Sequence, residues 1–112
     1  GSSVSVLRGW GNTTFSLLAT LATGTNPYWV AVADLNNDTR NDIIVSNYGT
    51  NTIGLFRGFG NGTFSAQITF AVSTNPSMFV VADFNNDGRL DIAVAIFSSN
   101  RIGIFRGHGN LT

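Results

Sequence analysis

Short apolar segments separated by turn residues recur along the whole chain. Tyr28–Ala33 and Asp42–Asn47 are apolar runs of strand length, and Asn, Gly and Pro residues flank them. Thr52–Arg57 alternates between its two faces, which predicts a third strand, and a less regular one is expected over Phe64–Val72. No window has convincing helical periodicity, so the pattern predicts an all-β fold.

The pattern repeats with a period of 49 residues. Residues 15–63 align with residues 64–112 without a gap, and 26 of the 49 aligned positions are identical. A third, partial copy opens the chain, because residues 7–12 match residues 56–61. We therefore expect residues 1–14 to end a preceding repeat, with Gly1-Ser2 typical of a cloning scar, followed by repeat 1 (15–63) and repeat 2 (64–112).

Four strands in a repeat of about 40–50 residues are typical of a β-propeller blade. The sequence thus predicts two four-stranded blades plus one extra N-terminal strand, with propeller completion by oligomerisation.

Composition excludes several classes of function. Only 11% of the residues are charged and the formal net charge is +0, so there is no basic surface for nucleic acid or an anionic membrane. No apolar run is long enough to span a bilayer. The chain has no Cys or Lys and a single His, and every carboxylate lies in one of two loops, so we expect no enzyme activity.

All acidic residues fall in two loops of the same pattern, Asp34–Asp42 and Asp83–Asp91. Oxygen donors recur at positions 1, 3, 5 and 9 of each loop, a spacing suited to Ca²⁺, which takes six to eight oxygens at about 2.3–2.6 Å. We expect about two calcium ions per chain. The candidate ligands, with the arginines contributing backbone carbonyls, are Asp34, Asn36, Asp38, Arg40 and Asp42 in the first loop and Asp83, Asn85, Asp87, Arg89 and Asp91 in the second.

Other interpretations of the loops explain less. Surface turns use one or two Asp or Asn, but three carboxylates in nine residues repel one another unless something neutralises them. An EF-hand needs a Glu at position 12 and flanking helices, and zinc or copper prefer imidazole or thiolate. Position 6 favours glycine at positive φ, so Gly88 suits the second loop. The β-branched Thr39 predicts strain in the first loop, which we therefore expect to be a weaker or differently bent site.

The pattern Asp-x-Asn-x-Asp-Gly-x-x-Asp, in a blade-length repeat ending Gly-x-Gly-Asn-Gly-Thr-Phe, resembles the FG-GAP and VCBS-type repeats of integrin α-subunit propellers. The resemblance implies that Tyr28–Ala33 and Met78–Ala82 are innermost strands, each leading into a metal loop. In this register the chain supplies strands three and four of one blade, then a complete blade, then strands one to three of another. The literal Gly-Ala-Pro element of integrins is replaced here by Asn-Pro. The resemblance also implies an extracellular, secreted or cell-surface protein with roles in adhesion, ligand binding or assembly.

Two blades cannot close a ring, and unpaired strand edges favour association. We therefore expect a homo-oligomeric ring of three or four chains in which Phe15–Leu21 of a neighbour completes the last blade. Val4–Arg8 and Ile102–Arg106 are copies of one strand, so a ring has one copy too many. The leading hypothesis is a noncatalytic adhesion or protein-interaction scaffold with structural Ca²⁺.

The alternative is a lectin-type propeller with sugar sites repeated between blades. The repeated arginines (Arg8, Arg57 and Arg106) either hydrogen-bond between blades as structural residues or, with aromatic residues such as Trp10, Trp29 and Tyr28, form a repeated pocket for a sugar or an acidic partner. A third hypothesis gives the chain no activity of its own. His108 shares its repeat position with Trp10 and Phe59, which favours a turn or surface role. Four Asn-x-Thr sequons, at Asn12, Asn37, Asn61 and Asn110, fit a secreted origin or simply tight turns.

Overall fold

The computed structural model describes residues 1–109 and confirms the all-β prediction; these residues contain no α-helix. The strands are β1 (Ser3–Gly9), β2 (Phe15–Ala22), β3 (Pro27–Ala33), β4 (Asp42–Asn47), β5 (Thr52–Phe56), β6 (Ile68–Ala71), β7 (Pro76–Ala82), β8 (Asp91–Ile96) and β9 (Arg101–Phe105), with a short 3₁₀ turn η1 (Phe97–Ser99) before β9. No helix in this part of the chain has the length and hydrophobicity of a membrane span.

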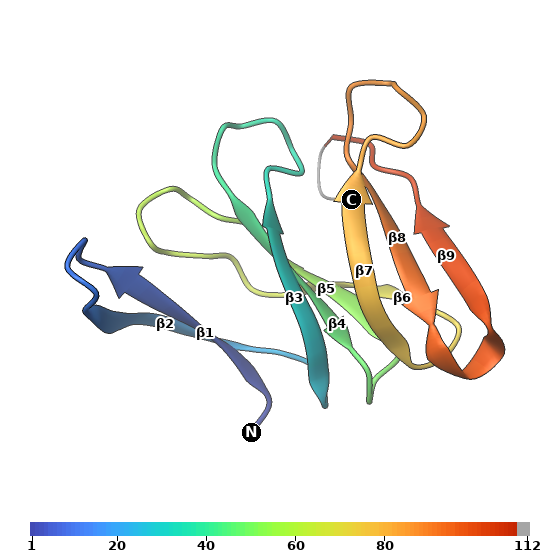
Figure 1. Ribbon diagram of the computed structural model, residues 1–112, viewed down its shortest axis with the longest axis horizontal. Helices are drawn as coiled ribbons and strands as arrows, with labels where there is room; N and C mark the ends of the chain where they lie inside the picture. Colours follow the sequence, from blue (N-terminus) through green and yellow to red (C-terminus); the bar gives the residue numbers. More distant parts are fainter. Residues whose placement is uncertain (110–112) are drawn as a thin grey trace.

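The strands form three antiparallel sheets in the order that the repeat predicts. The N-terminal sheet pairs β1 with β2, the middle sheet has the order β3-β4-β5-β6, and the C-terminal sheet has the order β7-β8-β9. Figure 1 shows the three sheets side by side in chain order, with β3 and β7 as neighbours. Within residues 1–109 only the middle sheet reaches four strands.

The fourth strand of the repeat differs from its expected form. The segment Phe64–Val72 forms a short β6, preceded by a single bridge between Gly58 and Phe64. The equivalent strand β2 is continuous from Phe15, and its pairing with β1 changes register between Val6 and Leu7. The proposed end of repeat 2 lies partly outside the described residues.

The main core lies between the middle and C-terminal sheets. It contains Leu35, Ile44, Ile53 and Leu55 from the first side and Phe79, Ile92, Val94 and Ile96 from the second. A smaller cluster of Ile43, Val45 and Phe56 lies on the opposite face of the middle sheet and contacts Val4, Val6 and Leu21 of the N-terminal sheet. Since β4 contributes to both clusters, all six of its residues are buried.

Candidate metal centre

Each acidic loop connects the first strand of its sheet to the second. The first loop joins β3 to β4, the second joins β7 to β8, and both lie at the same end of the molecule (Figure 1). The last residue of each loop, Asp42 or Asp91, is also the first residue of the next strand. The loops therefore stand at equivalent places, as the 49-residue repeat predicts.

Side-chain carboxylates organise each loop by accepting hydrogen bonds from its own backbone. The N–H groups of Asp38 and Thr39 donate to the two oxygens of Asp34, with N···O distances of 3.2 and 2.7 Å. In the second loop the N–H groups of Asp87 and Gly88 donate to Asp83 at 3.1 and 2.8 Å. The first carboxylate thus fixes the turn in the same way in both copies.

The carboxylates at position 5 of the loops, Asp38 and Asp87, also accept hydrogen bonds from backbone N–H groups of their own loops. The Arg40 N–H donates to Asp38 Oδ1 at 2.9 Å, and the Asn36 amide donates to Asp38 Oδ2 at 3.2 Å. The hydrogen bond from the Arg40 backbone is the main reason that the pKa of Asp38 lies below its ordinary value. In the second loop the backbone N–H of Arg89 likewise lowers the pKa of Asp87.

An arginine directly after the third strand of the C-terminal sheet approaches the second loop. Arg106 Nη2 lies 3.8 Å from Asp87 Oδ2, and the Arg106 side chain is largely exposed. An exposed pair at this distance adds little stability. The repeated arginine therefore lies near the acidic loop of its own sheet, where its charge favours the ionised carboxylate.

The closing carboxylates, Asp42 and Asp91, are buried and bridge two backbone segments. The Leu35 N–H donates to Asp42 Oδ2 at 3.0 Å, and the Gly58 N–H donates to Asp42 Oδ1 at 2.9 Å. Asp91 accepts from Phe84 and Gly107 at 3.0 and 2.7 Å. Each closing carboxylate therefore ties the start of the loop to the end of the third strand.

The sequence did not reveal this bridging role, nor the glycines that take part in it. A Cβ atom on Gly58 would collide with the backbone carbonyl oxygen of Asn41, and one on Gly107 with that of Leu90. The glycine lets the third strand pass close enough to donate to the buried carboxylate. The only signal available in the sequence is the recurrence of Arg-Gly at this point of each copy.

The prediction for position 6 of the loop is confirmed. Gly88 has φ +81°, and Thr39 has φ +66°, a conformation that β-branched residues resist. Thr39 nevertheless donates its N–H to Asp34 just as Gly88 donates to Asp83. The first loop therefore keeps the shape of the second at the expense of local strain.

The candidate ligands share each loop, but their carboxylates face backbone amides. Among residues 1–109, no three His, Cys, Asp or Glu side chains are grouped closely enough to hold a metal ion. The donor set nevertheless fits a hard cation, because it consists of oxygens alone. One oxygen, Asn36 Oδ1, is buried and accepts no hydrogen bond from the part of the chain that the structure describes.

The other candidate residues lie near the ends of strands or in the segments that follow them. The guanidinium of Arg8 lies 4.2 Å from the ring centroid of Trp10, and that of Arg57 lies 5.7 Å from the ring centroid of Phe59. The Asn61 side chain accepts a hydrogen bond from the Thr63 N–H of its own sequon, so this asparagine supports the turn. His108 lines a cavity between two sheets, and the sequon at Asn110 lies outside the described residues.

Comparison with known proteins agrees with the fold and with the repeated loops. A family model described as an FG-GAP-like repeat matches residues 34–94, a span that begins at the first acidic loop and includes the whole of the second. No curated protein and no solved structure has significant similarity to the chain. The matched span covers more than half of the chain, and the chain belongs to the FG-GAP-like repeat family.

Proposed function

We propose that the chain is a noncatalytic, calcium-binding β-propeller unit that assembles into an extracellular adhesion or protein-interaction scaffold. The observation that carries the calcium proposal is the repeated loop geometry. Two loops 49 positions apart have their carboxylates accept hydrogen bonds from the same backbone N–H groups, although residues 2, 6 and 8 of the loops differ. A shape maintained despite those differences favours a function for the carboxylates.

The oxygens for the ion would come from residues 1, 3, 5, 7 and 9 of each loop. Each carboxylate oxygen carries a second lone pair, so the oxygens of Asp34 and Asp38 can accept a hydrogen bond and also face a cation. Asn36 Oδ1 has both of its lone pairs free of hydrogen bonds from the described residues. Calcium binding would require the loop side chains to draw together around the ion.

The ion would act by neutralising three carboxylates and fixing the connection between the first and second strands. A ligand that binds only the folded state adds about 2.7 kcal/mol at a hundredfold excess over Kd. Domains of this kind are stable by only about 5–15 kcal/mol. Calcium is therefore expected to raise the melting temperature measurably.

The test is thermal unfolding in calcium and in chelator, for the wild type and two variants. Asp87→Ala should lower the melting temperature in calcium and change it little in chelator. Arg89→Ala is the matched control, because it keeps the proposed carbonyl ligand and should retain the calcium response. If Asp87→Ala loses as much stability in chelator as in calcium, Asp87 is not a ligand.

The assembly proposal is supported by the outer face of the C-terminal sheet. Leu35 of the first acidic loop and Ile53 and Leu55 of β5 are 7%, 1% and 4% exposed. The same repeat positions one period later, Phe84, Ile102 and Ile104, are 48%, 72% and 66% exposed. Leu35, Ile53 and Leu55 are buried because they pack against the C-terminal sheet, β7–β9. The outer face of β7–β9 is thus built for another sheet of this type.

The opposite surface of the middle sheet, which the N-terminal sheet covers only in part, presents the other side of such a contact. Val30 of β3 is 50% exposed, while Phe79, its repeat counterpart in β7, is buried against the middle sheet. A second copy could therefore repeat outside the chain the sheet-to-sheet contact that exists inside it. Such a contact is head-to-tail, and it closes a ring when the rotation per copy divides the circle.

Native mass spectrometry in a calcium-containing volatile buffer tests this proposal. We expect closed assemblies of three or four chains, carrying about two calcium ions per chain. A monomer at every concentration would overturn the assembly proposal. Assembly without bound calcium would overturn the metal proposal, while the proposal of a self-assembling scaffold would stand.

A further inference from the structure

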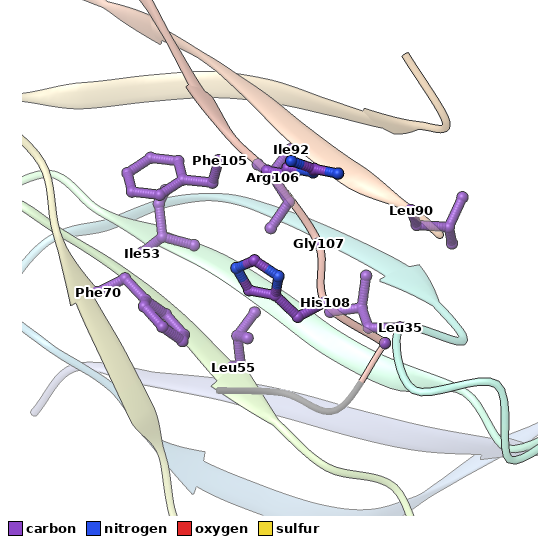
Figure 2. Close-up of a pocket in the computed structure, with 11 residues that line it drawn as sticks. Leu35, Ile53, Leu55, Phe70, Leu90, Ile92, Phe105, Arg106, Gly107 and His108 are labelled. Atoms are coloured by element: carbon purple, nitrogen blue, oxygen red, sulfur yellow. The ribbon is translucent and has the colours of Figure 1, made fainter. Parts of the chain in front are cut away.

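An apolar cavity of about 250 Å³ lies between the middle and C-terminal sheets. Its walls include Ile53, Leu55 and Phe70 on one side and Leu90, Ile92 and Phe105 on the other, and Figure 2 shows these side chains surrounding the space. Arg106, Gly107 and His108 also line it, and in Figure 2 the His108 ring points toward Ile53 and Leu55, so an incoming side chain would displace this ring. A cavity of about 150 Å³ with such a lining already accepts benzene, so this one has room for an aromatic side chain.

The equivalent place on the other face of the middle sheet is occupied by Phe64. This side chain packs on the cluster of Ile43, Val45 and Phe56, which the N-terminal sheet also contacts through Val4, Val6 and Leu21. Phe64 forms a bridge with Gly58, and its ring lies 3.4 Å from where a Cβ of that glycine would be. The first residue of the fourth strand thus closes the space between neighbouring sheets.

The cavity corresponds to this place after a shift of one repeat. Ile92, Phe105 and Gly107 stand 49 positions after Ile43, Phe56 and Gly58. The other phenylalanine at the repeat position of Phe64 is Phe15, which begins β2 and is 67% exposed. Its ring lies 3.3 Å from the Cβ position of Gly9, just as Phe64 lies over Gly58.

The strand that carries Phe15 already has the pairing that β9 needs. In the middle sheet Ile53 pairs with Phe70 and Gly54 pairs with Thr69. At the same repeat positions Val4 pairs with Leu21 and Ser5 pairs with Thr20 in the N-terminal sheet. Because β1 and β9 are copies of β5, β9 can pair with the same edge of β2 in the same register.

The apolar side chains of β9 are larger than those of β1, which favours β9 as the partner of β2. Ile102 and Ile104 of β9 stand where β1 has Val4 and Val6, so each adds one methylene group to a buried face. Both isoleucines are exposed in the single chain, whereas both valines already contact the smaller cluster. Exchange therefore buries apolar surface that the isolated chain leaves in water.

We propose that β2 of a second copy leaves its own β1 and pairs with β9, placing its Phe15 in the cavity over Gly107. This inference rests on the proposed self-assembly and identifies the strand that is exchanged. It makes β1 the surplus copy in the ring. The expected pairs are Leu21 with Ile102 and Thr20 with Gly103 across the two chains.

Engineered disulfides test the exchange, since the chain has no cysteine of its own. Thr20→Cys with Gly103→Cys gives every chain one thiol on β2 and one on β9, the two strands that are proposed to pair between chains. A Cβ at Gly103 meets Val94 at 3.4 Å, which is an ordinary contact. Oxidation should link chains into covalent rings of the size that native mass spectrometry gives. Thr20→Cys alone is the control for random collisions and should give no species beyond a dimer.

Ser5→Cys with Thr20→Cys measures the competing pair within one chain. If assembled protein closes this disulfide completely, while the Thr20 and Gly103 cysteines stay unlinked, β1 keeps β2 and the exchange is wrong even though self-assembly stands. If the wild type is monomeric, the proposed assembly fails instead. The two failures therefore have different signatures.

Phe15→Ala tests the cavity directly. Because Phe15 is exposed in the single chain, its truncation should leave far-UV circular dichroism unchanged. It should raise the concentration needed for half-assembly by at least about a hundredfold, as expected for a buried Phe truncated to Ala. Phe15→Leu should restore part of the assembly, and equal assembly of Phe15→Ala and wild type would overturn the proposal.

Discussion

Replacing the buried carboxylate of Asp42 should destabilise the chain even when calcium is removed. Asp42→Ala leaves two buried donors, the N–H groups of Leu35 and Gly58, without their acceptor. Each unsatisfied buried donor costs about 1–3 kcal/mol, so the pair is expected to cost about 2–6 kcal/mol. That is a large part of the roughly 5–15 kcal/mol by which a domain is stable.

The measurement is urea unfolding in chelator, followed by far-UV circular dichroism at one low protein concentration, because assembly adds to apparent stability. With a slope of about 1–3 kcal/mol per molar urea, a loss of about 2 kcal/mol moves the midpoint by at least about 0.7 M. Asp42→Asn should lie between wild type and Asp42→Ala, since it keeps one acceptor oxygen.

Asp38→Ala is the matched control for Asp42. The Arg40 N–H that donates to Asp38 is exposed, so water replaces the lost acceptor. In chelator we expect a much smaller midpoint shift than for Asp42→Ala, because substitutions at exposed sites with only local contacts change stability little. Equal midpoint shifts for Asp42→Ala and Asp38→Ala would refute the bridging role of the buried carboxylate.

Three further predictions concern the strands and loops. Gly54→Ala should destabilise by about 1–3 kcal/mol in urea unfolding, because its Cβ meets the Gln67 side chain, whereas the equivalent Gly103→Ala should cost under about 1 kcal/mol. Thr39→Gly should raise stability by about 1 kcal/mol by relieving φ +66°, and Gly88→Thr should lower it; no gain from Thr39→Gly would argue against strain. The pKa of Asp38 is lower in the folded state than in the unfolded state. Its contribution to folding stability is therefore present above the unfolded-state pKa and is lost as pH falls through the folded-state pKa. Asp38→Ala should thus flatten the decline in melting temperature below about pH 4.

The strand order and several strand limits could be predicted from the sequence, because the same pattern of apolar and turn residues occurs in each copy of the repeat. The strand Asp42–Asn47 was predicted to the residue, since a charged loop precedes it and turn residues follow it. The extent of β6 could not be predicted in the same way. Its pairing begins with a single bridge at Phe64 and resumes at Ile68, and no local pattern marks that interruption.

The acidic loops were predicted as chemistry, but the division of labour among their carboxylates was not. Asp34, Asp38 and Asp42 look equivalent in the sequence, yet only Asp42 is fully buried and reaches a donor outside the loop. That donor, the Gly58 N–H, lies 16 positions away and arrives only when β5 pairs with β4. The role depends on strand pairing, which the spacing of ligands does not encode.

Burial shows why one repeat cannot be interpreted without its neighbours. Leu35 and Phe84 hold the same position, yet one lies in the core and the other in water, because only the middle sheet has a sheet packed on that face. The apolar pattern of a repeat therefore encodes a sheet-to-sheet contact rather than a self-contained core. Each exposed copy of a buried position marks a contact that the single chain leaves unmade. Phe15 and the cavity at Phe105 are the two halves of one such contact, held at opposite ends of the same polypeptide.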